Sequence, residues 1–583
     1  MSLQTRLRSV RNIRKVPTVL QDTVTRIRKA RGTGTEEQNT PEVPAEASES
    51  IQEKPDISVG HVPAESPAEP EPVPQTPAEA AGEAPSGTNI GSLPSAKAVF
   101  DYFREIAAIP HGSFHTEAIS AYLEKFALDR GLNCRRDEMG NLIIRRPAAA
   151  GFENAAPVAL QGHIDMVCEK ELSNPIDMEK EAITVLQEGE WLRADRTTLG
   201  GDDGIAVAIM MAVLSDETIC CPPVECIFTV DEEVGLLGAA GIDLTDLQSR
   251  RLINIDSEEE GIITAGCAGG AEEVCTLTAQ RREKKGQALV LTVSGLKGGH
   301  SGECIGMGRA NADLLLARLL YRLETCGKYS IVSLNGGNRD NAIPRDARAE
   351  ILFTGKNVSR GKILNAVETF SEEIAAEYSM TDPEIRIDAV WGTGEEKGLG
   401  KDELRNAFSR KDSRRFVRFL LTLPNGVMEY SPLQDGMPQT SLSLGIVRTM
   451  ADGMRTHSLV RSNLNSQKQM LQDRFACLGD VFDADIEIHG AYPAWERIGN
   501  SAFRDLAVRT WEKISGSKAQ VQVIHSGLEC GLLAAKVPGL DCISIGPEME
   551  AIHTPAERLN IPSSERVYAY VLEILAECAR EKA

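Results

Sequence analysis

The sequence VALQGHIDM, residues 158–166, opens the stretch that decides the fold. It is followed by the segments TTLGGDDGIAVA (197–208), CIFTVDEEVGLLGA (226–239) and RLINIDSEEEG (251–261). Strand-like apolar runs alternate here with a helix that begins near Asp203, and every segment carries a cluster of His, Asp or Glu. Because open α/β folds place such side chains at the edge where consecutive strands end, we expect these clusters to converge. The stretch therefore predicts an α/β sheet with a pair of metal ions at one edge.

Length and composition indicate an ordinary globular chain of several domains. At 583 residues the chain is too long for a single core, so two or three domains are expected. Hydrophobic residues make up 42% and charged residues 25%, as in typical soluble proteins. No apolar run reaches the length of about eighteen residues that a transmembrane helix needs, so none is expected.

The net charge of −22 is unevenly spread. Residues 1–31 carry nine Lys or Arg and one Asp, a local charge of +8, so the remainder carries −22 minus 8, or −30. A body this acidic argues against nucleic-acid binding and gives no support for binding an anionic membrane. The basic segment is explained either as a solvated tail or as a targeting or docking peptide for an unknown partner or a membrane surface.

Changes in composition divide the chain into four segments. Residues 1–92 hold the basic segment and a linker rich in Pro, Glu and Ala, which we expect to be disordered because it cannot bury enough apolar surface. Residues 93–270 and 485–583 are expected to form the two parts of a catalytic domain, a βαβ-type sheet flanked by helices. Residues 271–484 are expected to form an inserted α+β domain.

Periodicity locates the main helices. Residues 95–109 and 116–132 have apolar residues at three- and four-residue spacing, which predicts two amphipathic helices. In the inserted domain strands alternate with long helices, and SLVRSNLNSQKQMLQDRFACLG (458–479) is predicted to be one helix. The insertion explains why the last candidate ligand, His553, lies so far beyond Asp256.

The thirteen cysteines favour a reducing compartment. They occur singly or as the adjacent Cys220 and Cys221, without a CxxC motif and without a secretory segment before them. We therefore expect a cytoplasmic protein with mostly buried thiols, which the N-terminal extension could redirect.

His163 is the first candidate metal ligand. A lone histidine is more often a hydrogen-bonded core residue than a ligand. The HxD spacing favours a ligand here, because Asp165 can accept the second ring N–H and fix the tautomer, as carboxylates do for metal-bound histidines.

Four carboxylates and a second histidine extend the set. Asp202 of GGDDG is explained equally well as a helix N-cap. Glu232 and Glu233 follow an apolar strand, so one could bind a metal while the other acts on water as general base; a solvated loop is the alternative. Asp256 ends a strand, and His553 follows a late one. Two histidines and three carboxylates suit two zinc-like ions that share a carboxylate.

The motifs together carry a family resemblance. HIDM, GGDDG, DEE, INIDSE and the late HTP occur in the order seen in the M20 metallopeptidases, which this sequence resembles. GGHSG, GRANA, NAIPRDA, QTSLSLG and HSGLECG are similar to the motifs of the aminoacyl-histidine dipeptidases, also called Xaa-His or cytosol nonspecific dipeptidases. The resemblance runs from about residue 93 to residue 583. It departs from the family in GGDDG for GADNG or GADDG, in the lead-in to QTS, and in HTP for HSP.

The resemblance implies a zinc-peptidase-type catalytic domain with an inserted α+β lid and two divalent ions. Zn²⁺ is the ion it favours, with Co²⁺ or Mn²⁺ as alternatives. His163 and Asp256 would bind one ion, Glu233 and His553 the other, and Asp202 would bridge them.

The resemblance also implies the catalytic and substrate-binding residues. Asp165 would orient the first histidine, and Glu232 would act as general base in hydrolysis by a metal-bound hydroxide. From the lid, His300 would hold the scissile carbonyl, while Asn341 and Arg461 would bind the substrate. Local sequence alone explains Arg461 as a surface residue of a helix.

The implied function is hydrolysis of short peptides, Xaa-His dipeptides above all, by a homodimer. The residues themselves leave monomer and dimer open. The same ligands would serve an M20-type N-acyl amino acid amidohydrolase or an exopeptidase for longer peptides. A catalytically silent scaffold or binding protein is the remote alternative, and the presence of all five ligands argues against it.

Overall fold

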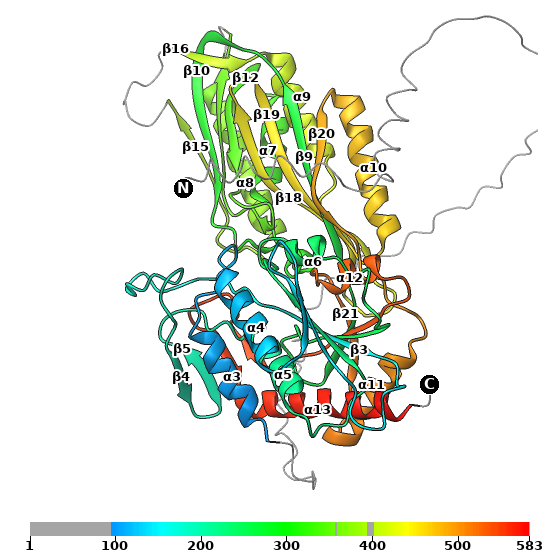
Figure 1. The fold of residues 1–583 in the computed structure, drawn as a ribbon. Helices are drawn as coiled ribbons and strands as arrows, with labels where there is room; N and C mark the ends of the chain where they lie inside the picture. The colour runs from blue at the N-terminus through cyan, green and yellow to red at the C-terminus, as the bar shows by residue number, and fades with distance from the viewer. Residues whose placement is uncertain (1–94, 356–357, 393–401, 582–583) are drawn as a thin grey trace, which may run out of the picture. The chain divides into compact units, whose positions relative to one another are not determined.

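The computed structural model describes residues 95–355, 358–392 and 402–581 (Figure 1). These residues belong to one compact unit, Ala84–Ala583. The predictions of a basic segment and a disordered linker for residues 1–92 therefore lie outside the described residues.

The first sheet is mixed, with eight strands in the order β1-β2-β6-β3-β7-β22-β8-β21. The strands are β1 (Asn133–Arg136), β2 (Leu142–Arg146), β3 (Val158–His163), β6 (Val224–Thr229), β7 (Arg251–Asn254), β8 (Ile262–Cys267), β21 (Gln520–Ile524) and β22 (Asp541–Ser544). The central strands β6, β3, β7 and β22 are parallel. Because parallel strands end at the same edge, the residues that follow β3, β6 and β7 meet there, as the sequence predicts.

Helices cover both faces of this sheet. On β2, Leu142 and Ile144 face one helical layer while Ile143 faces the other. The first layer consists of α3 (Lys97–Ala107), α4 (Glu117–Asp129), α5 (Gly201–Ser215), α11 (Ala502–Ser515) and α13 (Ile561–Arg580). The second consists of α6 (Leu237–Gly241) and α12 (Cys530–Lys536). The two amphipathic helices predicted at the start of this domain correspond to α3 and α4.

A small sheet joins the late part of the chain to the early part. Its order is β23-β24-β5-β4, with bounds β4 (Val185–Glu188), β5 (Trp191–Ala194), β23 (Met549–Glu550) and β24 (Arg558–Asn560). The antiparallel pairing of β24 with β5 holds the 551–557 loop near the turn that leads into α5. This pairing places the late histidine motif beside GGDDG.

The second sheet contains ten strands. Its main path is β15-β10-β14-β12-β18-β19-β9-β20, with β16 paired to β10 and β17 to β18. The bounds are β9 (Gly269–Thr278), β10 (Arg281–Ser294), β12 (Tyr329–Gly336), β14 (Ala347–Phe353), β15 (Arg386–Trp391), β16 (Glu403–Phe408), β17 (Gly426–Tyr430), β18 (Pro438–Met450), β19 (Gly453–Ser462) and β20 (Asp485–Tyr492). β20 begins at residue 485, where the second part of the catalytic domain was predicted to start, yet it pairs with β9 in this second sheet.

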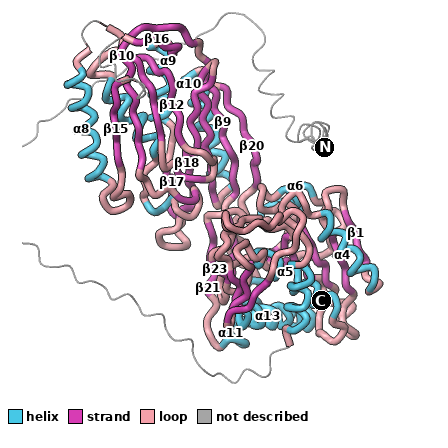
Figure 2. The backbone as a smooth tube through the Cα atoms, turned by 90° about the vertical axis from the view of Figure 1, so that its left-hand side faces the viewer, coloured by secondary structure: helices cyan, strands magenta, loops and turns pink. Residues whose placement is uncertain are grey.

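The ten-stranded sheet is built from two halves of the same topology. The helices are α7 (Ala312–Leu323), α8 (Arg360–Glu377), α9 (Arg410–Thr422) and α10 (Asn465–Phe482), and they share one core with the sheet (Figure 2). One half runs β10-α7-β12-β14-α8-β15, and the other runs β9, then α9-β18-β19-α10-β20. In each half the strands lie in the order fourth, first, third, second. The first half is thus inserted into the second, and the β12–β18 pair joins them.

One predicted helix is wrong in its first part. The segment predicted as a helix over 458–479 begins as β19, and only Asn465–Phe482 is helical. β19 is paired on both sides, with β18 and with β9. These ladders outweigh the local helical pattern, because strand formation depends on neighbouring strands more than on intrinsic preference.

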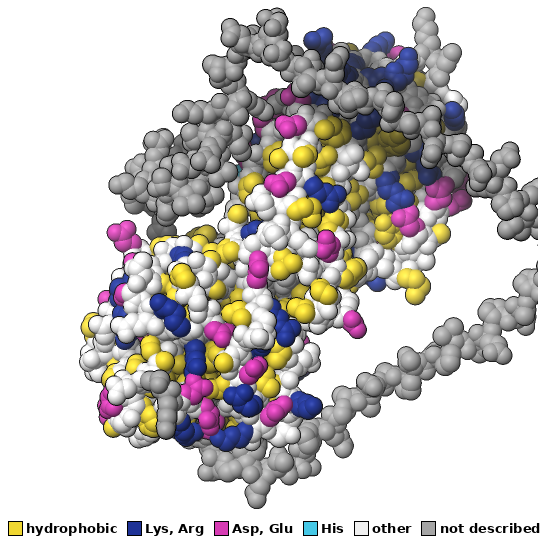
Figure 3. All heavy atoms as spheres, turned by 90° about the vertical axis from the view of Figure 1, so that its right-hand side faces the viewer, with side chains coloured by type: hydrophobic (Ala, Val, Ile, Leu, Met, Phe, Trp, Pro, Cys, Tyr) yellow, Lys and Arg dark blue, Asp and Glu magenta, His cyan; other side chains and the backbone are white. Residues whose placement is uncertain are grey.

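On the face drawn in Figure 3, acidic and basic side chains are interspersed among apolar ones.

The thirteen cysteines, all of them in the described part, are free. In the described ranges, no helix is both long and apolar enough to cross a membrane.

Candidate active site

His163 is the last residue of β3 and is buried. Its Nδ1 atom lies 3.0 Å from the carbonyl oxygen of Asp165 and 3.5 Å from the carboxylate. That carboxylate accepts hydrogen bonds from the backbone N–H of Glu232 at 3.0 Å and of Glu233 at 3.3 Å, and from the hydroxyl of Ser113 at 2.8 Å. Asp165 therefore fixes both the first histidine and the DEE turn.

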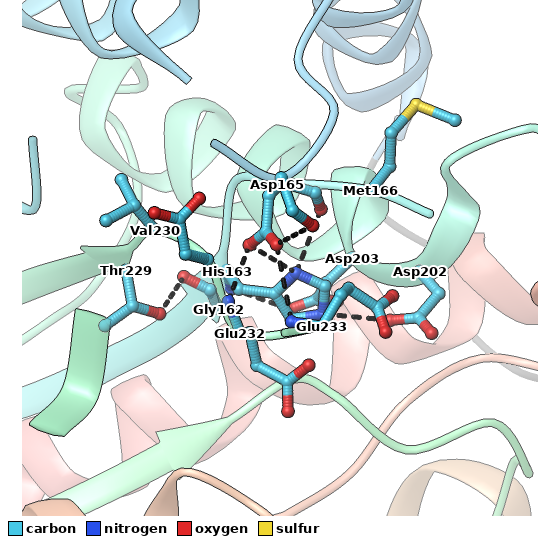
Figure 4. Close-up of polar contacts among 12 residues, drawn as sticks. Gly162, His163, Asp165, Met166, Asp202, Asp203, Thr229, Val230, Glu232 and Glu233 are labelled. Carbon is cyan, nitrogen blue, oxygen red and sulfur yellow. Dashed lines mark hydrogen bonds and ion pairs between the residues drawn. The ribbon is translucent and has the colours of Figure 1, made fainter. Parts of the chain in front are cut away.

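Asp202 lies between two histidines. Its Oδ1 is 3.0 Å from His163 Nε2 (Figure 4). Its Oδ2 is 3.0 Å from His553 Nε2. His553 Nε2 is also 2.9 Å from Glu233 Oε1, and His163 Nε2 is 3.7 Å from Asp256 Oδ1. The structure thus brings together all five residues that the sequence suggested as ligands.

The spacing of these atoms fits divalent metal ions. Ligand atoms about 2.0–2.1 Å from a tetrahedral zinc ion lie ~3.3 Å from one another. The distances of 2.9–3.7 Å between the facing atoms bracket that value. Two groups have ligand atoms within 4.8 Å of one another, His163 with Asp202 and Glu233, and His163 with Asp203 and Asp256.

The charges at the site call for a cation. Hydrogen bonds that His553 donates to the carboxylates of Asp202 and Glu233 raise its pKa to about 11. Burial lowers the pKa of His163, but contacts with Asp165 and Asp202 outweigh it and hold that pKa well above its ordinary value. Without a metal the carboxylates therefore stabilise protons on both imidazoles, whereas a bound metal requires neutral imidazole and supplies the positive charge itself.

The two adjacent glutamates have different surroundings. The Glu233 carboxylate lies beside that of Asp202, while the Glu232 side chain points in another direction (Figure 4). Burial raises the pKa of Glu232 well above its ordinary value, opposed by His163 and supported by Asp256. A carboxyl group with a raised pKa in such a place can both take and return a proton.

The GGDDG turn is held by a residue that the sequence did not single out. Glu557 is buried, and its carboxylate accepts hydrogen bonds from the backbone N–H groups of Leu199 at 2.7 Å, Gly200 at 3.3 Å and Gly201 at 2.8 Å. Gly200 has φ of 68°, a conformation that glycine adopts without strain. Among the described residues the Asp202 carboxylate bonds only to the two imidazoles, so the alternative of a helix cap is not supported.

Two further buried carboxylates were missed. Asp203 accepts a 3.2 Å hydrogen bond from the backbone N–H of His163, and its Oδ1 has no partner among the described residues. Glu529 accepts 2.5 Å hydrogen bonds from the side chains of Gln161 and Thr229, and burial raises its pKa to about 7. In the sequence, the second aspartate of GGDDG and the glutamate of HSGLECG could have pointed to these two residues.

The remaining predicted residues lie on the second sheet and its loops. β11 (Gly299–His300) pairs with β13 (Ala342–Ile343), so Asn341 lies next to His300, although the described contacts include none from its side chain. His300 Nε2 is 3.4 Å from Arg461 Nη2. Arg461 lies on β19 and is only 6% exposed, so its explanation as a surface residue of a helix is wrong.

Most of the chain is similar to known proteins. The model of Peptidase family M20/M25/M40 matches residues 159–580. A cytosol non-specific dipeptidase of Escherichia coli K12 is 37% identical over 488 residues, which span 83% of this chain and 98% of that protein. An uncharacterized Bacillus subtilis protein, YqjE, is 26% identical over 498 residues, 83% of this chain and 99% of its own length.

A solved structure supports the fold. The crystal structure of an aminoacylhistidine dipeptidase from Vibrio alginolyticus has a TM-score of 0.73 and 34% identity, covering 85% of this chain and 99% of that one. The predicted α/β fold with an inserted α+β domain is confirmed, and so is the resemblance drawn from the motifs. This chain belongs to Peptidase family M20/M25/M40.

Proposed function

We propose that this chain is a metal-dependent dipeptidase that hydrolyses Xaa-His dipeptides with two bound ions, preferably Zn²⁺. The observation that carries the proposal is Asp202, whose two oxygens each lie 3.0 Å from a different imidazole nitrogen. One carboxylate facing two histidines in this way suits a bridge between two ions. Co²⁺ and Mn²⁺ are the alternative ions for the same ligands.

The five residues divide between the two ions. His163 and Asp256 would hold one, His553 and Glu233 the other, and Asp202 both. The carboxylate of Asp165, 3.5 Å from His163 Nδ1, keeps that ring oriented with Nε2 toward the ion.

Glu232 carries the proton in the proposed reaction. Bound divalent ions would lower the pKa of a water molecule and polarise the scissile carbonyl. Glu232 takes a proton from the attacking water and delivers it to the leaving amine. Its backbone N–H donates to Asp165, so the base is fixed to the same group as the first histidine.

The residues on the second sheet would hold the substrate. Burial and the neighbouring Arg461 lower the pKa of His300, which keeps it neutral, and as a neutral donor it would bind the oxyanion. Arg461 would pair with the C-terminal carboxylate, because its planar guanidinium matches a carboxylate. Asn341, which directly precedes β13, would contact the peptide beside His300.

The other parts of the proposal concern assembly and place. We propose that residues 93–270 and 485–583 form the catalytic domain and residues 271–484 its lid, except that β20 (Asp485–Tyr492) belongs with the lid because it pairs with β9 in the second sheet. We also propose that the chain assembles as a homodimer. The name of the Escherichia coli relative favours a cytoplasmic location.

A substrate panel tests the function. Metal-loaded protein should hydrolyse β-Ala-His and Gly-His faster than N-acetyl amino acids or longer peptides, and a chelator should abolish the activity. Glu232→Gln should keep its metal while turnover falls by about 10²- to 10⁴-fold. The exposed Glu259→Gln is the matched control. A preference for N-acetyl amino acids, or full turnover in Glu232→Gln, would contradict the proposal.

A further inference from the structure

Tyr492 occupies a place that two glycines keep open. It is the last residue of β20 and pairs with Gly270 of β9. A Cβ atom at Gly270 would come within 2.7 Å of the phenol ring, and one at Gly527 within 3.0 Å. Any side chain at either position would displace the ring. Gly270 and Gly527 thus leave the space that the Tyr492 ring fills.

The hydroxyl of Tyr492 is directed at Arg461. Arg461 Nη1 donates to the hydroxyl oxygen at 3.3 Å. The described contacts include no acceptor for the hydroxyl's own hydrogen. Burial raises the pKa of Tyr492, so this hydrogen stays in place at neutral pH. Tyr492 therefore offers a free O–H donor beside the guanidinium.

Arg461 is a buried cation that lacks an anion. In the described part of the chain it forms no ion pair, and its Nε has no hydrogen-bond partner. The neighbouring His525 is bound to Ser441 Oγ at 2.7 Å, and burial together with Arg461 lowers its pKa to about 3, so it stays uncharged. A buried charge left unpaired is costly, and a bound anion would relieve the cost.

We propose that Tyr492 is a substrate-binding residue that, together with Arg461, receives the C-terminal carboxylate of the dipeptide. The inference rests on the proposed function and adds a second donor to the Arg461 site. Arg461 supplies the charge, and the Tyr492 hydroxyl donates to a carboxylate oxygen.

Paired substrates with and without the carboxylate test this role. Full-length, metal-loaded Tyr492→Phe should show a KM for Gly-His raised about 10-fold, as for a lost hydrogen bond to a charged group, with kcat changed little. Its KM for Gly-His amide should match that of the wild type. Arg461→Met should lose the preference for the free carboxylate altogether. Tyr321→Phe, an exposed tyrosine of α7, is the matched control.

A binding measurement separates this inference from the proposed function. In calorimetry, Tyr492→Phe should bind L-histidine more weakly than the wild type does, whereas its affinity for L-histidinamide should be unchanged. If the wild type hydrolyses no dipeptide but binds L-histidine more tightly than Tyr492→Phe does, the proposed function is wrong and the carboxylate site stands. Equal losses for both histidine ligands, or a fall in kcat alone on both peptides, would make Tyr492 a structural residue and overturn the inference.

Discussion

Asp202 and His553 are 351 positions apart in the sequence, yet Oδ2 of one lies 3.0 Å from Nε2 of the other. The contact depends on the pairing of β24 with β5, which brings the late loop to the GGDDG turn. The last part of the chain therefore completes the site, and the small sheet β23-β24-β5-β4 holds it there.

Asp202→Asn should cost the chain its metal pair. The amide keeps the shape but replaces one of the two oxygens that face the histidines, and it removes the negative charge. Mutation of a residue that only supports a ligand lowers metal affinity by up to about 100-fold. Because Asp202 is itself the proposed ligand, we expect its loss to lower metal affinity by at least that factor. Metal content after dialysis, measured by mass spectrometry, checks this. Asp483→Asn, at a 96% exposed side chain, is the control, and a full metal content in Asp202→Asn would contradict a bridging role.

Metal binding should strengthen as the pH rises. In the metal-free protein the pKa of His553 is raised from 6.5 to about 11. The proton on His553 therefore stabilises the folded protein fully below about pH 6.5, and this stabilisation is lost as the pH rises through about 11. A metal at the same nitrogen displaces this proton. Competition titrations should therefore give a tighter Kd at each step from pH 6.5 to 8.5, with at least one proton released per chain. A Kd independent of pH would show that His553 is not a ligand, and His489→Gln should leave the trend unchanged.

Glu557→Gln should weaken the site without touching a ligand. Glu557 uses both carboxylate oxygens to accept three backbone N–H groups ahead of Asp202, and the glutamine amide nitrogen cannot accept. The turn should shift, and metal affinity should fall about 10- to 100-fold, as for other residues that support ligands. Glu550→Gln, at an exposed position of the neighbouring strand, is the comparison. Equal metal affinity in both variants would limit Glu557 to holding the fold.

The sequence was sufficient for residues whose neighbours in the chain reveal their chemistry. His163 ends β3, and Asp256 lies two residues beyond the end of β7. Both positions at the sheet edge could be predicted because apolar runs of strand length stop there, and parallel strands share an edge. Glu232 and Glu233 follow the same rule after β6.

Residues whose role comes from distant contacts could not be found in this way. Glu557 acts through backbone groups more than 350 positions away. Arg461 was assigned to a helix, because the two ladders that make β19 a strand depend on partners near residues 270 and 441. Tyr492 is placed by two glycines from separate motifs. The two similar halves of the second sheet were also hidden, because one half interrupts the other.

One chain should complete its own site. His300 lies 3.4 Å from Arg461 of the same chain, Arg461 contacts Tyr492, and the charge of His553 lowers the pKa of His300. We therefore expect that a mixture of Glu232→Gln and His300→Ala chains, unfolded and refolded together, is no more active on Gly-His than the two variants separately. If the lid histidine came from a partner subunit, random pairing would restore about a quarter of the sites. Wild-type protein taken through the same refolding shows whether the procedure itself preserves activity. Restored activity in the mixture would place His300 in the partner's site and make the dimer obligatory for catalysis.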